Sequence, residues 1–172
     1  MVSIVIPFAG ADGKTRLNLS GEMRATLAAA MLADVLAACR GVGETRVATM
    51  GGGQGPAVAA ALAEVSGPVV VVNADLPCVT TADLVQLVDA TPSLVEAADG
   101  TTNALSLASA DDFAPLYGPG SAKRFRAHTG AGSLEIPNLA DDVDTMDDLA
   151  RLEPRLGEHT RFVLAQLERS VA

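Results

Sequence analysis

The stretch GPVVVVNADLPCVTTADL, residues 67–84, determines how the rest of the chain is interpreted. Its four consecutive valines predict a strand that is buried on both faces, as in the middle of a parallel sheet. Asp75 follows this strand directly and Pro77 ends it, so a carboxylate lies at the carboxyl edge of the sheet, where ligands bind. Taken alone, the stretch is explained slightly better by an aspartate that caps its own turn.

Apolar strands alternate with helical patterns along the chain. We expect strands over residues 2–7, 44–50, 68–73, 102–108 and 133–137, and helices over 21–39, 56–65, 80–90 and from 145 to about 170. Ser20, Thr80 and Thr145 are expected to cap three of these helices. The order predicts the α/β class: a three-layer, Rossmann-like fold with a mostly parallel sheet and helices on both faces, in one domain over residues 1–172.

The charge balance excludes some classes of partner. The chain has 21 acidic and 12 basic residues and a net charge of -9. We therefore expect no nucleic acid and no membrane as partners, since both need basic patches. Residues 47–122 contain no Lys or Arg, so phosphate binding there would depend on backbone N–H groups, hydroxyls or a metal. Cys39 and Cys78 lack metal or redox spacing, which predicts free thiols and a cytoplasmic location.

A second acidic stretch, ADDVDTMDD, covers residues 140–148. Asp142 and Asp144 alternate around Val143, so in an extended segment both side chains point to the same side. Two such carboxylates repel each other unless a cation lies between them. A cation shared with Asp75 would explain them, and Mg²⁺ is usually held by one or two carboxylates together with substrate phosphates.

Two glycine-bearing segments are candidates for binding anions. Lys14 and Arg16 follow Gly10 in the loop between the first strand and the first helix, a usual place for a nucleotide phosphate, although an exposed basic loop is the simpler interpretation. In YGPGSAKRF, Gly118 and Ser121 precede a short basic helix and could form an anion cradle; a turn before a solvated helix is the alternative.

Together these motifs resemble the 2-phospho-L-lactate guanylyltransferase family of coenzyme F-420 biosynthesis, whose bacterial members include phosphoenolpyruvate guanylyltransferases. The resemblance covers most of residues 2–150 and rests, in this order, on GKTRLNLS, GPVVVVNADLPCVTTADL, GTTNALSL, YGPGSAKRF and DDVDTMDDL. It implies a nucleotidyltransferase fold and the Mg²⁺-dependent transfer of GMP from GTP to phosphoenolpyruvate or 2-phospho-L-lactate, with release of pyrophosphate.

The resemblance also implies roles for residues. It assigns Asp75, Asp142 and Asp144 to Mg²⁺. The phosphorylated acid would bind to Thr102, Gly118 and Ser121, and the nucleotide to Gly10, Lys14 and Arg16. The catalytic residues would be Lys14, Asp75 and Asp144.

The chain departs from the family pattern, so it resembles a shortened member: among other changes, the Asn of a family helix motif is not found, and Pro56 and Ala57 stand near its place. Ala9 stands where the family usually has a lysine after the first strand, and RVATM passes almost at once to GGGQGPAVAAAL. Alternatives are a molybdenum-cofactor-type or sugar-phosphate nucleotidyltransferase, and a non-catalytic paralogue that binds nucleotide. A homodimer is a further expectation, because Phe162, Leu164 and Leu167 could pack on the core or on another subunit.

Overall fold

The computed structural model describes residues 1–10, 14–49 and 51–171. These residues form one six-stranded sheet with the strand order β2-β1-β3-β5-β4-β6. The strands are β1 (Val2–Phe8), β2 (Gly43–Thr49), β3 (Val69–Val72), β4 (Ser93–Glu96), β5 (Thr102–Leu107) and β6 (Gly132–Ser133). Only β5 runs antiparallel to its neighbours β3 and β4, so the sheet is mostly parallel, as predicted.

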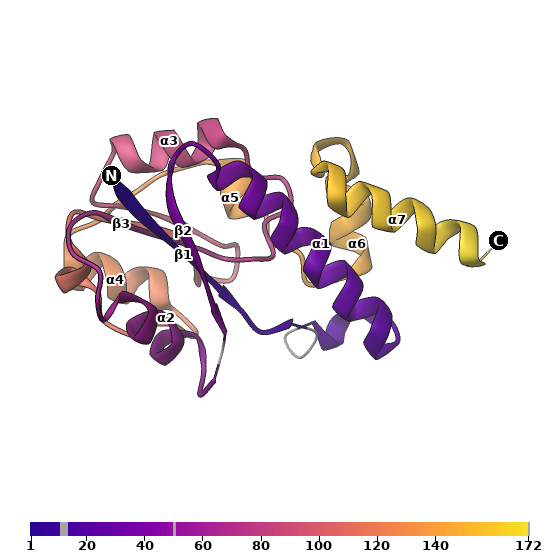
Figure 1. Cartoon of the computed structure of the whole chain (residues 1–172), viewed down its shortest axis with the longest axis horizontal. Coiled ribbons are helices and arrows are strands. Elements are labelled where there is room, and N and C mark those ends of the chain that lie inside the picture. The colour runs from indigo at the N-terminus through magenta and orange to yellow at the C-terminus, as the bar shows by residue number, and fades with distance from the viewer. Residues whose placement is uncertain (11–13, 50, 172) are drawn as a thin grey trace.

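Helices cover both faces of this sheet and give three layers (Figure 1). α1, α3 and α5 contribute to the buried cluster on one face, and α2 and α4 to the cluster on the other. Their bounds are α1 (Gly21–Cys39), α2 (Gln54–Leu62), α3 (Thr81–Asp89), α4 (Ser121–Thr129), α5 (Pro137–Ala140), α6 (Met146–Leu152) and α7 (Glu158–Val171). Single 3-10 turns cover Thr15–Leu17, Ala110–Asp112 and Glu153–Arg155. Among the described helices, none is both long and apolar enough to cross a membrane.

The valine run occupies the middle of the sheet, as its composition predicts. Val69 and Val71 belong to the cluster with α2 and α4, whereas Val70 and Val72 belong to the cluster with α1 and α3. Successive strand residues point to opposite faces, so a strand covered on both sides needs apolar residues at every position. The predicted caps are also confirmed, since Ser20, Thr80 and Thr145 accept hydrogen bonds from the first turns of α1, α3 and α6.

Two predictions about strands were wrong. The expected strand over 133–137 is reduced to β6, because Pro137 begins α5 and turns the chain away from the sheet. The prediction also missed β4, which lies between Pro92 and the turn at residues 98–100. Four residues are too few for periodicity to identify a strand, and β4 is defined instead by its pairing with β5.

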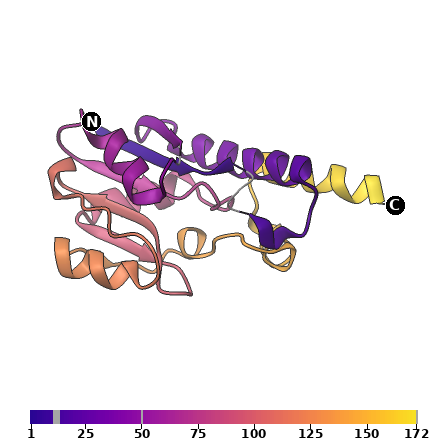
Figure 2. The ribbon, with the colours of Figure 1, turned by 90° about the horizontal axis from the view of Figure 1, so that it is seen from below.

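The C-terminal helix α7 lies beside α1 and extends beyond the sheet (Figures 1 and 2). Asp34 on α1 is 5% exposed and accepts hydrogen bonds at 2.9 Å from the backbone N–H groups of His159 and Thr160. His159 Nδ1 also lies 2.9 Å from this carboxylate. Gly157 permits the close approach, since a Cβ there would lie 2.3 Å from Asp34 Cγ. Asp34 therefore caps a helix that belongs to a distant part of the chain.

We expect Asp34→Ala to lower the free energy of unfolding by about 1–3 kcal/mol, because the first-turn N–H groups of α7 would lose a buried acceptor. Urea unfolding followed by circular dichroism measures this difference. Asp89→Ala is the control, since Asp89 is an exposed aspartate near the end of α3. Equal stability of the two variants would contradict the capping role of Asp34.

Candidate active site at the carboxyl edge of the sheet

Three carboxylates meet where β3 ends. Asp75 follows β3, and Asp142 and Asp144 lie in the segment between α5 and α6. One oxygen from each of the three lies within 4.8 Å of the others. The backbone N–H of Val143 donates to the carbonyl of Asp75 at 3.0 Å, and the Val143 side chain is fully buried. The acidic segment is thus fixed against the end of β3, with its two alternating aspartates toward Asp75.

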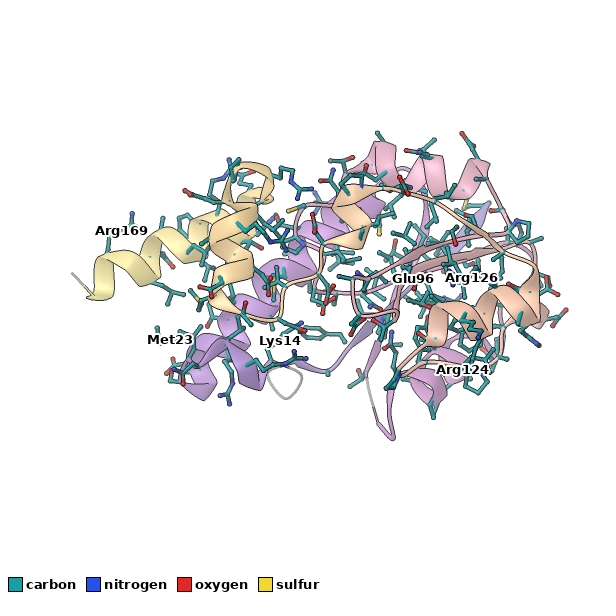
Figure 3. The ribbon with its side chains drawn as sticks, turned by 180° about the vertical axis from the view of Figure 1, so that it is seen from behind. Lys14, Met23, Glu96, Arg124, Arg126 and Arg169 are labelled. Carbon is teal, nitrogen blue, oxygen red and sulfur yellow. The ribbon has the colours of Figure 1, made fainter. Side chains whose placement is uncertain are left out.

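Lys14 supplies positive charge to this cluster. Its Nζ lies 2.5 Å from Asp75 Oδ2 and 3.2 Å from Asp144 Oδ1, and it donates a hydrogen bond of 2.5 Å to the carbonyl of Val143. Lys14 is 8% exposed, and Figure 3 shows it near the start of α1. A buried ammonium needs such partners, because an unpaired charge in the interior is costly. The structure therefore places Lys14 on the carboxylates, and a direct role toward nucleotide stays a prediction.

The electrostatics of the cluster follow from its burial and its charges. Burial by itself would lower the pKa of Lys14, but the charges and hydrogen bonds of Asp75 and Asp144 outweigh it and raise that pKa above its ordinary value. Burial raises the pKa of Asp142, and the negative charges of Asp75 and Asp144 raise it further, against the hydrogen bond from Asn103. Asp142 is thus held in a site that already carries excess negative charge.

One oxygen of the cluster has no protein partner. Asp75 Oδ1 is buried, and no hydrogen bond reaches it from the described residues. A buried carboxylate oxygen without a donor is costly, and a cation is one group that satisfies it. The three carboxylates also provide the hard oxygen ligands that Mg²⁺ prefers. Asp75, Asp142 and Asp144 therefore fit a divalent cation.

A cavity of about 230 Å³ opens beside the carboxylates. Its lining residues come from the end of β1 and the loop after it, the middle of α1, the start of α2, the turn after β3 and the acidic segment: Pro7, Phe8, Ala9, Gly10, Lys14, Ala28, Met31, Gln54, Asn73, Ala74, Asp75 and Asp144. Gly10 adopts a positive φ of 63°, which favours glycine at this point. The expected glycine loop also includes residues 11–13, which lie outside the described residues.

Arg16 stands at the edge of the site. Its guanidinium lies 3.0 Å from Asp144 Oδ2, yet 73% of the side chain is exposed. The structure thus brings Arg16 to the carboxylates while it leaves most of the side chain exposed to a ligand. Its predicted role toward the nucleotide stays a prediction.

The residues expected to bind the phosphorylated acid lie where β5 meets α4. Ser121 Oγ accepts a hydrogen bond of 2.9 Å from the backbone N–H of Thr102, and the two hydroxyls lie 3.1 Å apart. Both side chains are buried. Gly118 belongs to the loop before α4, where Arg124 donates to the carbonyls of Leu116, Tyr117 and Pro119; Figure 3 labels Arg124 on this helix. These hydrogen bonds link β5 to the start of α4. The role of Thr102, Gly118 and Ser121 in binding the phosphorylated acid stays a prediction.

Sequence reasoning gave no role to two asparagines that support the site. Asn73 Nδ2 donates to Asn103 Oδ1 at 3.2 Å, and Asn103 Nδ2 donates to Asp142 Oδ1 at 3.3 Å. Their positions in the sequence could have identified them, because each asparagine stands at an end of an apolar strand, in VVVVNAD and TTNALSL. A polar amide at the edge of a buried strand needs partners, and ligand-site side chains are one source of them.

Comparisons with known proteins relate the chain to one group of enzymes. No family model matches it. It is 36% identical to a 2-phospho-L-lactate guanylyltransferase from Natronomonas pharaonis, over 88% of this chain and 84% of the relative. It is 31% identical to a phosphoenolpyruvate guanylyltransferase from Streptomyces coelicolor, over 96% of each chain. A phosphoenolpyruvate guanylyltransferase from Streptomyces scabiei is 33% identical over 68% of this chain, and that match covers 62% of the relative's length.

A solved structure agrees with the fold. A protein from Desulfovibrio desulfuricans G20, which carries the provisional name nucleotide-diphospho-sugar transferase, superposes with a TM-score of 0.72. The superposition covers 98% of this chain and 95% of that one, at 18% sequence identity. At this identity the likeness establishes the fold alone: an α/β nucleotidyltransferase-like fold.

We expect Lys14→Met to lower the free energy of unfolding at neutral pH by about 2 kcal/mol, because Asp75 and Asp144 would lose their buried counter-ion. The pKa of Lys14 is raised in the folded state, so its stabilisation is complete below the ordinary value of 10.5 and is lost as pH rises through the raised pKa. The deficit of the variant should therefore persist at neutral pH and shrink only in strong alkali.

Urea unfolding at several pH values measures this effect. Lys123→Met is the matched control, since Lys123 is exposed on α4. If Lys14→Met were as stable as this control at neutral pH, the counter-ion role would be wrong.

Proposed function

The chain belongs to the family of 2-phospho-L-lactate and phosphoenolpyruvate guanylyltransferases, and from this premise we propose that it transfers GMP from GTP to a phosphorylated three-carbon acid in coenzyme F-420 biosynthesis. The observation that supports this most is the group of Asp75, Asp142 and Asp144 at the carboxyl edge of the sheet, with one buried oxygen of Asp75 unpaired. Such a group suits the binding of a cation beside phosphates.

Asp75, Asp142 and Asp144 are the proposed ligands of Mg²⁺. When bound, a divalent cation supplies positive charge that offsets the crowded negative charge of the reacting phosphates. The chain itself brings the ligands together. Val143 fixes the acidic segment to the end of β3, and Asn103 orients Asp142 by donating a hydrogen bond to it.

The proposed reaction needs no nucleophile from the protein. A phosphate oxygen of the acid attacks the α-phosphorus of GTP, a new P–O bond forms, and the bond to the bridging oxygen of the β-phosphate breaks as pyrophosphate leaves. Catalysis then depends on position and charge. Arg16 offers an exposed side chain to the phosphates, and Lys14 forms ion pairs that hold Asp75 and Asp144 close together. Thr102, Gly118 and Ser121 are the proposed cradle for the acid.

A cytoplasmic location is part of the proposal. Cys39 and Cys78 are both free and buried, and burial raises the pKa of each thiol, to about 11 for Cys39. Thiols of this kind are unreactive and do not call for an oxidising compartment. We keep a homodimer as a prediction, because Phe162 on α7 is 61% exposed.

Phosphoenolpyruvate, 2-phospho-L-lactate and 3-phosphoglycerate are supplied in turn to the purified protein with Mg²⁺ and GTP. We expect pyrophosphate to be released with only one of these three acids. EDTA should abolish the release. Asp75→Asn should reduce it to background without unfolding the protein, whereas Asp147→Asn, at an exposed position in the first turn of α6, should leave it unchanged.

The other outcomes separate the alternatives. Release with glucose 1-phosphate instead would favour a sugar-phosphate nucleotidyltransferase. A folded protein that binds GTP but releases no pyrophosphate with any acceptor would favour the non-catalytic paralogue.

Binding of Mn²⁺ in place of Mg²⁺ should depend on Asp142 and on pH. The pKa of Asp142 is raised, so this carboxyl takes up a proton at a higher pH than an ordinary aspartate, for which the pKa is about 3.9. Affinity for Mn²⁺, measured by electron paramagnetic resonance, should therefore fall as pH is lowered toward that raised pKa.

Asp142→Asn tests the same metal site without a change of pH. Loss of an outer-shell partner of a metal already costs about 10–100-fold in affinity, so loss of a direct ligand should cost at least about 100-fold. Asp147→Asn should bind Mn²⁺ as the wild type does. Unchanged affinity in Asp142→Asn would remove Asp142 from the metal site.

A further inference from the structure

A chain of side-chain amides runs from the cavity to Asp142. Gln54 Nε2 donates to Asn73 Oδ1 at 2.7 Å, and Asn73 Nδ2 donates to Asn103 Oδ1 at 3.2 Å. Asn103 Nδ2 then donates to Asp142 Oδ1 at 3.3 Å. Three amides therefore donate in one direction, and the chain ends on a carboxylate of the proposed metal site.

Backbone carbonyls fix this direction, because a carbonyl can only accept. Asn103 Nδ2 also donates to the carbonyl of Ala140 at 3.2 Å, so the NH₂ group of Asn103 must point that way. Asn73 Nδ2 also donates to the carbonyl of Thr102 at 3.4 Å. The oxygen of Asn73 is then left to face Gln54, which can bond to it only by donating from Nε2.

The orientation of Gln54 follows from this chain. With Nε2 held by Asn73, the amide oxygen Oε1 is directed away from Asn73, and none of the described residues donates a hydrogen bond to it. Gln54 is partly buried and lines the same cavity as Lys14, Asp75 and Asp144. A ligand in this cavity therefore meets a fixed hydrogen-bond acceptor at Gln54.

The backbone at Gln54 is also held in place. Gln54 is the first residue of α2, and the preceding Gly53 has a φ of 102°, which favours glycine. Gly55 is buried against Pro115, where a Cβ would lie 2.8 Å from the Pro115 Cβ. α2 lies on the face of the sheet opposite α1 (Figure 1), so Gln54 approaches the cavity from the side opposite Ala28 and Met31.

A group that binds to this oxygen must donate a hydrogen bond. The phosphates of GTP and the ionised groups of phosphoenolpyruvate, 2-phospho-L-lactate and 3-phosphoglycerate that face a cationic site are acceptors. Apart from the hydroxyl of 3-phosphoglycerate, the donors belong to the nucleoside. Guanine offers two side by side, N1–H and the N2 amine, whereas adenine has an acceptor at N1. Phe8, Ala28 and Met31 give the cavity apolar walls that suit a base.

We propose that Gln54 determines nucleotide specificity, with Oε1 accepting a hydrogen bond from the N1–H and N2-amine edge of guanine. This inference rests on the proposed function. A site that is built to hydrogen-bond a substrate group discriminates strongly against an analogue that lacks it. Gln54 is thus a specificity-determining residue. The chain of hydrogen bonds from Asn73 to Asp142 orients its amide so that Oε1, and not Nε2, is available to the ligand.

The test compares GTP with ITP, which lacks the N2 amine but is otherwise the same. Wild-type protein with Mg²⁺ should bind GTP about tenfold more tightly than ITP in calorimetry, the value of one hydrogen bond. Gln54→Met should bind GTP about tenfold less tightly and should no longer prefer it over ITP. In turnover the change should appear in KM for GTP, with kcat nearly unchanged. Gln86→Met, at an exposed position on α3, is the matched control and should keep the preference.

Each contrary outcome has a definite meaning. Equal binding of GTP and ITP by the wild type would overturn the inference even without a folded variant. A preference for GTP that survives in Gln54→Met would overturn it as well. If Gln54→Met instead lost its preference for GTP over 2′-deoxy-GTP, Oε1 would accept from the ribose and the base assignment would be wrong. A wild type that binds no nucleotide would overturn the proposed function and this inference together.

Discussion

Three carboxylates within 4.8 Å of one another repel, and a fold that brings them together must balance their charge. In this chain the balance comes from Lys14, whose ammonium contacts Asp75, Asp144 and the carbonyl of Val143. These contacts join three segments that are far apart in sequence: the loop between β1 and α1, the turn after β3 and the acidic segment before α6. Lys14 does not offset all of the negative charge of the three carboxylates, and this excess favours a cation beside the unpaired oxygen of Asp75.

The sheet explains why the site lies where it does. Parallel strands β1 and β3 end side by side, so the loop after β1 and the turn after β3 meet at one edge. The antiparallel strand β5 adds its beginning to the same edge, which places Asn103 next to Asn73. The one reversed strand thus supplies the link between the carboxylates and the amides of the cavity.

Much of the fold and part of the candidate site could be predicted from the sequence, because these features depend on residues that are close together along the chain. The valine run, the helix caps and the alternation of Asp142 with Asp144 each follow from the period of a strand or the chemistry of a helix end. The position of Lys14 could not be predicted in the same way, because its pairing depends on which loops the sheet brings together. The amide chain was missed for a related reason: it requires β5 to pair with β3, and β4, which returns the chain to β5, is too short to show a period.

Whether the chain transfers GMP can be seen in a ³¹P NMR spectrum of the protein with Mg²⁺, GTP and its preferred phospho-acid. We expect free pyrophosphate together with two coupled resonances from a new diphosphate bridge, because the acid attacks the α-phosphorus. GDP with inorganic phosphate would show that the bond broken lies at the γ-phosphorus, and the chain would then not be a guanylyltransferase. An unchanged spectrum from folded protein, with each of the three phospho-acids, would also contradict GMP transfer by this chain.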